Sequence, residues 1–127
     1  DILHRGHIEY LSQAAGLGDV LFIGLNTDDS VKRIKGRNRP VNHQESRALF
    51  LASLQFVSYV SYFEEDTPLQ LIKNVQPDIL VKGGDYRADE IVGYDEVTKN
   101  GGQVKIIPFL QGYSSSGIIE KIIKTKD

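Results

Sequence analysis

Apolar runs and helical patterns alternate along the whole chain. Short, continuous apolar runs between turn residues are typical of strands that are covered on both faces. Apolar positions that recur every three or four residues predict helices between those runs. The pattern predicts strands at 19–25, 57–63, 78–82 and 103–109. It predicts helices at 7–15, 42–56, 68–75 and 88–99, and a terminal helix with the buried stripe Ile118, Ile119, Ile122 and Ile123.

Local signals support the ends of several helices. Asn42 and Glu45 have the spacing of a capping box, and Thr67 can cap a helix whose first position is Pro68. Glycine at position 16 predicts the end of the first helix. The apolar side of the second helix is expected to consist of Ala48, Leu49, Ala52 and Phe56.

Strands that are joined by helices run parallel with right-handed crossovers. The order of elements therefore predicts one α/β domain over residues 1–127, with a Rossmann-like, three-layer α/β/α fold and a mostly parallel sheet. Only "DIL" stands before the first helix, so we expect that a first strand precedes residue 1. Ligands of such sheets bind where strands end, and "NTDD", "KGGDY" and "QGYSSSG" each follow a predicted strand.

Composition narrows the class of protein. The formal net charge of -2 argues against general attraction to nucleic acids or membrane surfaces, and no apolar run has the length of a membrane span. Cysteine is absent, which excludes disulfides, thiolate zinc sites and cysteine nucleophiles and favours a cytoplasmic location. Because the net charge is slightly negative, a site that binds anions must rest on a local cluster of basic residues.

The segment "HRGH" places His4 and His7 three residues apart at the start of a helix. Their imidazoles can point to one place beside the free N–H groups of the helix end, which is an environment for an anion. Gly6 between them would let a base or a phosphate approach the backbone. A solvated pair and half of a metal site are the alternatives, although a metal would need further carboxylate ligands.

The segment "KRIKGRNRP" at 32–40 contains five Lys or Arg residues and no acid. Such a cluster attracts a polyanion, although many basic runs are only solvated loops. The segment lacks the aromatic residues on which single-stranded nucleic acids stack. A mobile loop that carries Lys35 over phosphates fits the pattern better.

Two further segments carry polar groups suited to a substrate. Three hydroxyls, Ser114, Ser115 and Ser116, precede the terminal helix, where one serine suffices for a cap and the others can bind a phosphate. After the third strand, Gly83 permits close approach of a ligand, and Asp85 can accept from a sugar hydroxyl or a Mg²⁺-bound water. An ordinary glycine turn with a capping aspartate is the alternative.

The chain has no Walker sequence, no GxGxxG fingerprint and no serine nucleophile elbow. "HRGH" resembles the HxGH signature of the nucleotidyltransferase superfamily, which includes cytidylyltransferases and adenylyltransferases, and "GYSSSGII" resembles its second signature before the last helix. The segment 24–57 and "PDILVKGGDY" look most like the nucleotidyltransferase domains of bacterial ADP-heptose synthases. Asp1 matches the last letter of the "G-x-F-D" turn that precedes HxGH in the family.

The resemblance implies a reaction of ATP with a sugar 1-phosphate, expected to be a heptose 1-phosphate. The products would be a nucleotide-sugar for the lipopolysaccharide core and pyrophosphate. The charge of the reacting phosphates would be neutralised by the imidazoles, the helix ends, the basic loop and Mg²⁺. Two alternatives stay open: a CTP-dependent cytidylyltransferase for a polyol or amino-alcohol phosphate, and a nucleotide-binding module without chemistry. Phe109 stands where the glycerol-phosphate branch carries an arginine, which speaks against that branch.

Roles are carried over by motif. His4, His7 and Lys35 are the expected catalytic residues, although Lys32, Arg33 and Arg37 also match the position of the family's loop lysine. The expected nucleotide- and phosphate-binding residues are Asp1, Gly6, Asn26, Arg47, Gly83, Ser114, Ser115 and Ser116. Asp85 and Arg37 are expected to contact the sugar phosphate, and no metal ligand is assigned. A homodimer and a fused or separate sugar kinase are the expected partners.

Overall fold

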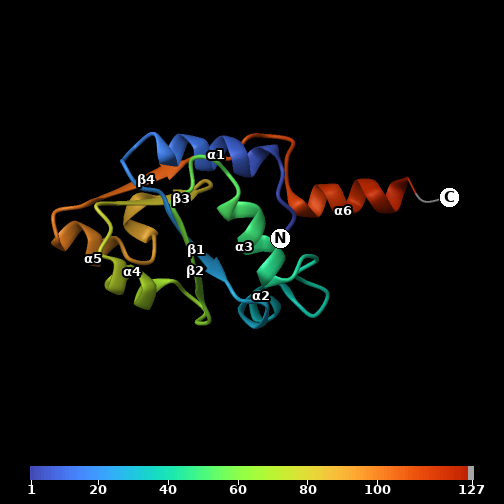
Figure 1. The fold of residues 1–127 in the computed structure, drawn as a ribbon, viewed down its shortest axis with the longest axis horizontal. Helices are drawn as coiled ribbons and strands as arrows, with labels where there is room; N and C mark the ends of the chain where they lie inside the picture. The colour runs from blue at the N-terminus through green and yellow to red at the C-terminus, as the bar shows by residue number, and fades with distance from the viewer. Residues whose placement is uncertain (126–127) are drawn as a thin grey trace.

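The computed structural model of the chain describes residues 1–125, in which helices and strands alternate (Figure 1). In chain order, the elements are α1 (Arg5–Ala15), β1 (Phe22–Asn26), α2 (Asp28–Lys35), α3 (Gln44–Ala52), β2 (Tyr59–Phe63), α4 (Leu69–Val75), β3 (Ile79–Gly83), the 3-10 helix η1 (Ala88–Glu90), α5 (Tyr94–Lys99), β4 (Gln103–Ile107) and α6 (Ser115–Lys124).

The strands are parallel but form two sheets. β1 pairs with β2, starting at Phe22 opposite Tyr59, and β3 pairs with β4, starting at Ile79 opposite Gln103. The predicted α/β class is therefore confirmed, whereas the expected single sheet is divided, because within residues 1–125 neither β1 nor β3 pairs with a second strand. The strand expected before residue 1 lies outside the sequence and stays a prediction.

The helices cover the two sheets separately. α3 packs against β1 and β2, and α2 packs against β1. α5 packs against β3 and β4, and α1 packs against β4. α6 projects away from the rest of the molecule (Figure 1). β1 ends in the polar segment "NTDD", and β3 ends in the polar segment "KGGDY", as the sequence predicts.

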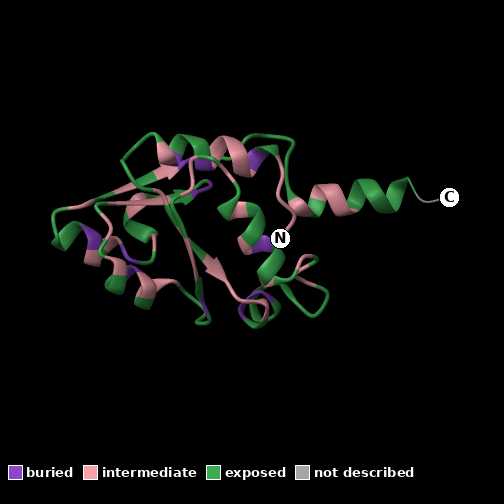
Figure 2. Cartoon of the chain, in the orientation of Figure 1, coloured by how far each residue is buried: buried purple, intermediate pink, exposed green. Residues whose placement is uncertain are grey.

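The buried apolar core is small (Figure 2). The accessible surface is 8588 Å², against roughly 6,800 Å² expected for a compact monomer of this mass. Two narrow sheets and a projecting helix account for this open shape. The buried apolar residues are Leu11, Ala14, Val31, Phe63, Ile72, Val97 and Ile107.

The start of α3 differs from the prediction. His43, and not Asn42, is the N-cap residue, and its side chain makes no capping hydrogen bond. Asn42 contributes to tertiary contacts instead, since its amide donates to the carbonyl of Asp1 and its own carbonyl accepts from Arg47. The helix also ends at Ala52, before Phe56. Leu49, expected on the buried side, is exposed.

Three other predicted elements differ in detail. The helix expected at 88–99 is interrupted at Gly93, whose φ of 94° lies in a region that favours glycine. Thr67 does not cap α4, for which Pro68 is the N-cap residue. The stripe expected to be buried on α6 is exposed at Ile122 and Ile123, since α6 projects from the body.

The core around α4 and α5 gives a first prediction. Ile72 is 7% exposed and packs on Gly93, where an added Cβ would lie 2.7 Å from its Cδ1. Ile72→Ala leaves a cavity and is expected to lower the free energy of unfolding by about 2–5 kcal/mol. Ile122→Ala is the control, because Ile122 is 62% exposed. Equal urea midpoints for the two variants would contradict this description of the core.

Candidate active site

The first turn of α1 is held by its own histidines. His4 is the N-cap residue, and its Nδ1 accepts from the backbone N–H of Gly6 at 3.0 Å. The Nδ1 of His7 accepts from the backbone N–H of His4 at 3.2 Å, which completes a capping box. The two ring centroids are 4.0 Å apart. Because each Nδ1 is an acceptor, a neutral ring carries its proton on Nε2 and can donate from there to a ligand.

Burial favours the neutral form of both histidines. Burial lowers the pKa of His7 to about 4, assisted by the charges of His4 and Lys35. Burial also lowers the pKa of His4. In the neutral form the imidazoles offer N–H donors, and positive charge comes from the nearby cations. Their expected contribution to neutralising phosphate charge stays a prediction.

Gly6 has a packing role within the protein. A Cβ at this position would lie 2.8 Å from Cε1 of His4 and 3.2 Å from Cβ of Tyr113. The missing side chain therefore makes room for the folded-back imidazole and for the turn before α6. The expected approach of a ligand to Gly6 stays a prediction.

The turn before α6 meets the histidine segment, although the two are separated by more than a hundred residues. The hydroxyl of Ser115 accepts from the N–H of Ile2 and donates to its carbonyl, both at 3.1 Å. Tyr113 stacks beside the ring of His4 with centroids 6.5 Å apart, and Arg5 lies over the tyrosine ring. The two signature segments therefore form one surface.

The three serines, expected to bind phosphate together, have separate positions. Ser114 caps α6 by accepting from the N–H of Gly117 at 2.9 Å. Ser115 is used by the backbone of Ile2. Ser116 lies in the first turn of α6 and is exposed, and its hydroxyl has no protein hydrogen bond within residues 1–125. Of the three, Ser116 best retains the role of a phosphate donor.

The structure separates the basic residues at 32–40. Arg33 lies away from the histidines, since its Nε pairs with Asp66 at 2.9 Å and its guanidinium also contacts Glu64. Lys35 is the last residue of α2, and its ammonium contributes to the lowered pKa of His7. Burial, Arg39 and Arg47 in turn lower the pKa of Lys35 itself. Among the basic residues at 32–40, Lys35 is thus the one whose charge lowers the pKa of His7.

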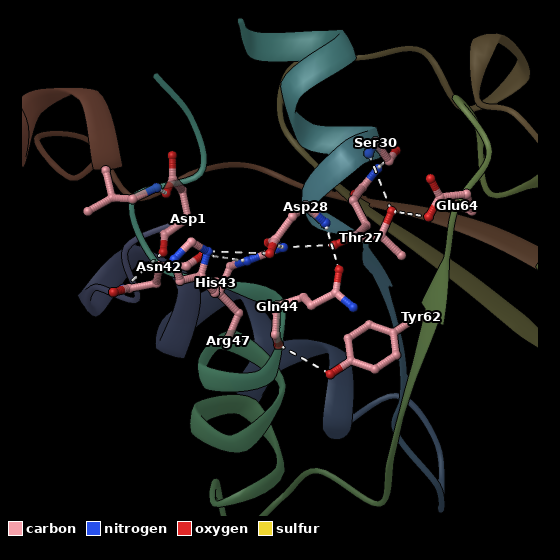
Figure 3. Close-up of polar contacts among 12 residues, drawn as sticks. Asp1, Thr27, Asp28, Ser30, Asn42, His43, Gln44, Arg47, Tyr62 and Glu64 are labelled. Carbon is pink, nitrogen blue, oxygen red and sulfur yellow. Dashed lines mark hydrogen bonds and ion pairs between the residues drawn. The ribbon is translucent and has the colours of Figure 1, made fainter. Parts of the chain in front are cut away.

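Arg47 binds protein acceptors rather than solvent (Figure 3). Its side chain is 6% exposed. Nε donates to the carbonyl of Asn42 at 2.9 Å, Nη1 donates to the carbonyl of Asn26 at 2.9 Å, and Nη2 donates to the carboxylate of Asp28 at 2.7 Å. Each guanidinium nitrogen therefore has a partner. Three of its five N–H groups are used in this way, which gives Arg47 a structural role, and its expected contact with a nucleotide stays a prediction.

Asp28 completes this network. Burial by itself raises the pKa of Asp28, but the hydrogen bond and charge of Arg47 and the adjacent His43 outweigh burial and lower it. The amide of Gln44 accepts from the N–H of Asp28 at 2.9 Å. The Asn26 amide donates to Ser30, which is fully buried and donates to the carbonyl of Glu65. Asn26 is thus held at the end of β1 by protein contacts on its amide and its carbonyl.

Asp1 was expected to bind the nucleotide, but its carboxylate is 1% exposed. It forms an ion pair with Nε of Arg39 and accepts from the N–H of Val41 at 2.6 Å. The carboxylate therefore binds the loop that follows α2. In the sequence, Arg39 is one of five similar basic residues. Only its pairing with the carboxylate of Asp1 in the structure distinguishes it.

The segment after β3 is less constrained. A Cβ on Gly83 would lie 2.7 Å from Phe109 and 3.2 Å from Tyr10, so packing against aromatic rings explains this glycine. Asp85 and Arg37 are exposed. Their assignment to the sugar phosphate stays a prediction.

Two hollows lie outside the histidine surface. One of about 280 Å³ lies between α4 and α5, and one of about 320 Å³ lies beside the end of β2. Within residues 1–125, no group of three or more His, Asp or Glu side chains is arranged to hold a metal, and no helix there is long and apolar enough to cross a membrane.

The candidate site is an open surface that offers N–H donors and cations to a ligand.

A parallel α/β fold with capping histidines, a serine turn and cations on one surface defines a nucleotide-binding domain of the Rossmann-like class. The chain belongs to the cytidylyltransferase-like family, whose model matches residues 1–121. This confirms the resemblance to the HxGH nucleotidyltransferase superfamily.

Relatives in both sequence and structure agree with this assignment. The chain is 54% identical over 126 residues to the bifunctional protein HldE of Helicobacter hepaticus, and 53% identical over 127 residues to that of Haemophilus influenzae. These matches cover 99% and 100% of the chain but only 25% and 27% of the relatives. The crystal structure of the lipopolysaccharide core biosynthesis protein from Thermoplasma volcanium is 32% identical, with a TM-score of 0.68. That match covers 90% of the chain and 91% of the solved chain.

The lowered pKa of His7 predicts how stability changes with pH. Between the ordinary value near 6.5 and the folded value of about 4, the unfolded chain binds more protons than the folded chain. His7 is therefore expected to lower the free energy of unfolding progressively from pH 6.5 to pH 4, by on the order of 2 kcal/mol.

The matched variant is His7→Asn, which keeps an acceptor for the N–H of His4 but does not titrate. Its urea-unfolding free energy should fall less steeply over the same pH range. Equal slopes for the two proteins, or an NMR titration of His7 near pH 6.5, would contradict the proposed burial.

Proposed function

We propose that the chain transfers AMP from ATP to a sugar 1-phosphate, most specifically a heptose 1-phosphate, and releases pyrophosphate. The observation that carries this proposal is the junction of "HRGH" with the serine turn through Ile2 and Ser115, with Lys35 beside it. The HldE relatives and the lipopolysaccharide core biosynthesis neighbour support a precursor of the lipopolysaccharide core as the product.

The chemistry needs no protein nucleophile. An oxygen of the sugar phosphate attacks the α-phosphorus of ATP in line, one P–O bond forms, and the bond to the β-phosphate bridging oxygen breaks as pyrophosphate leaves. Catalysis then consists of bringing two anions together and stabilising the charge on the phosphorus and leaving group. Fixed donors and cations are the groups suited to that task.

Each side chain has a role that follows from its position. The Nε2–H groups of His4 and His7 donate to oxygens of the α-phosphate, since each Nδ1 is held by backbone N–H. The ammonium of Lys35 neutralises charge on the leaving phosphates. The exposed hydroxyl of Ser116 and the N–H groups at the start of α6 donate to the same phosphates.

Mg²⁺ is expected to arrive with the nucleotide. Mg²⁺ commonly binds through one or two carboxylates together with substrate phosphates rather than through a full protein cage. Asp1 is not suited as a ligand, because its carboxylate is already paired. The roles of the histidines and Lys35 do not depend on where Mg²⁺ binds.

The wider setting is also proposed. The chain spans about a quarter of the length of its HldE relatives, which supports association with a further domain, expected to be a sugar kinase. A homodimer stays a prediction. Use of ATP supports a cytoplasmic location.

The first experiment measures pyrophosphate release with ATP and with CTP against heptose 1-phosphate, glycerol 3-phosphate and phosphocholine. Turnover only with ATP and the heptose phosphate is expected. Turnover with CTP would instead assign the chain to the cytidylyltransferase alternative. ATP binding without pyrophosphate release from any pair would indicate a module without chemistry.

A second experiment tests the assigned side chains. Because His7 and Lys35 stabilise charge that develops during the reaction, His7→Ala and Lys35→Ala are each expected to lower kcat on the order of 100-fold or more. Lys99→Ala is the control for loss of a lysine, since Lys99 is exposed at the end of α5, near the amino end of β4. Full activity of the His7→Ala protein would refute the mechanism.

A further inference from the structure

The two arginines of the candidate site use their guanidinium groups differently. Arg47 has a protein acceptor for each of its three nitrogens. Arg39 has a single side-chain partner, since only its Nε meets the carboxylate of Asp1. Within residues 1–125, no protein acceptor is found for its two terminal nitrogens, although the side chain is only 19% exposed. Arg39 thus retains up to four N–H donors in a partly buried setting.

Asp1 fixes the place of Arg39. Its buried carboxylate accepts from the N–H of Val41 as well as pairing with Arg39. Its carbonyl accepts from the amide of Asn42 at 3.2 Å. Three successive contacts therefore hold the loop from Arg39 to Asn42 against the segment that leads into His4. A guanidinium that is held by Nε presents its terminal nitrogens as a rigid fork.

Protein carboxylates pair with two of the three cations around Arg39, and Lys35 is left without one. Asp1 pairs with Arg39 and Asp28 pairs with Arg47. Lys35 has no carboxylate within 4.0 Å among the ion pairs of residues 1–125. The lowered pKa of Lys35, due to burial and then to Arg39 and Arg47, is consistent with three cations gathered here. An anion is the ligand that such a group favours.

We propose that Arg39 binds the phosphate groups of the nucleotide through its two terminal nitrogens, and that Asp1 is the positioning residue that orients it. The inference rests on the proposed function and adds a residue to its binding site. A guanidinium fork matches two phosphate oxygens with parallel hydrogen bonds, which a single ammonium does not. Asp1 then contributes to phosphate binding without touching the ligand.

The experiment uses isothermal titration of the full chain with tripolyphosphate and with ATP. Arg39→Ala is expected to weaken the binding of both ligands about tenfold or more, as for a lost hydrogen-bonded charge contact. Arg39→Lys keeps the charge without the fork and is expected to bind with intermediate affinity. Lys99→Ala controls for the loss of one positive charge and should bind as the unchanged chain does.

A double-variant cycle tests the positioning role. Asp1→Asn should weaken binding by roughly fivefold when Arg39 is present and should have no further effect in the Asp1→Asn/Arg39→Ala protein. A merely structural role of Asp1 would weaken binding equally in both backgrounds. Melting temperatures show whether each variant is folded, and Arg39→Lys provides the test if Arg39→Ala does not fold.

The outcomes separate this inference from the proposed reaction. Tripolyphosphate affinity that is unchanged in folded Arg39→Ala or Arg39→Lys protein would overturn the role of Arg39. Additive losses in the cycle would overturn the role of Asp1. Failure of the proposed reaction would instead appear as absence of pyrophosphate release, while the dependence of tripolyphosphate binding on Arg39 remained.

Discussion

The segments around the carboxyl end of β1 are held in place by one buried guanidinium, that of Arg47. Arg47 is removed from water, and an unpaired charge in that position would cost about 3–5 kcal/mol. Its partners come from three separate segments: the end of β1, the first residue of α2 and the loop before α3. Satisfying one side chain therefore fixes three backbone segments relative to α3. The end of α2 with Lys35 and the following loop with Arg39 are positioned by this constraint.

The histidines serve structure and chemistry with the same hydrogen bonds. Capping of α1 requires an acceptor at each Nδ1, and this requirement leaves the proton of each neutral ring on Nε2. Burial keeps His7 in the neutral form. The helix end therefore selects the tautomer that can donate to a phosphate, and cations elsewhere supply the charge.

Some of the candidate site could be predicted from sequence, because its signals are local. The spacing of His4 and His7 around Gly6 indicated a helix start suited to an anion, and "KRIKGRNRP" indicated a cationic loop. The individual roles within those segments could not be predicted. The basic residues are alike in sequence, and only contacts with distant carboxylates distinguish Arg33, which meets Asp66, from Arg39, which meets Asp1.

Local pattern also misled where distant contacts compete. Asn42 has the spacing of a capping residue, but its amide and carbonyl bind Asp1 and Arg47, so α3 begins at Gln44. Gly83 suggested space for a ligand, and in the structure Phe109 and Tyr10 pack where its Cβ would stand, while the expected contact with a nucleotide stays a prediction. In both cases a residue suited to one local role is used by a partner far along the chain.

The sequence by itself determined the alternation of helices and strands, the parallel α/β class and the segments that carry chemistry, because periodicity and capping depend on neighbouring residues. Only the tertiary structure decided that the strands form two sheets, that Ser115 joins Ile2, and that Asp1 and Arg47 act within the protein. Those features are contacts between groups that are distant in the chain. Such contacts depend on which groups the fold brings together, and the pattern of neighbouring residues does not contain that information.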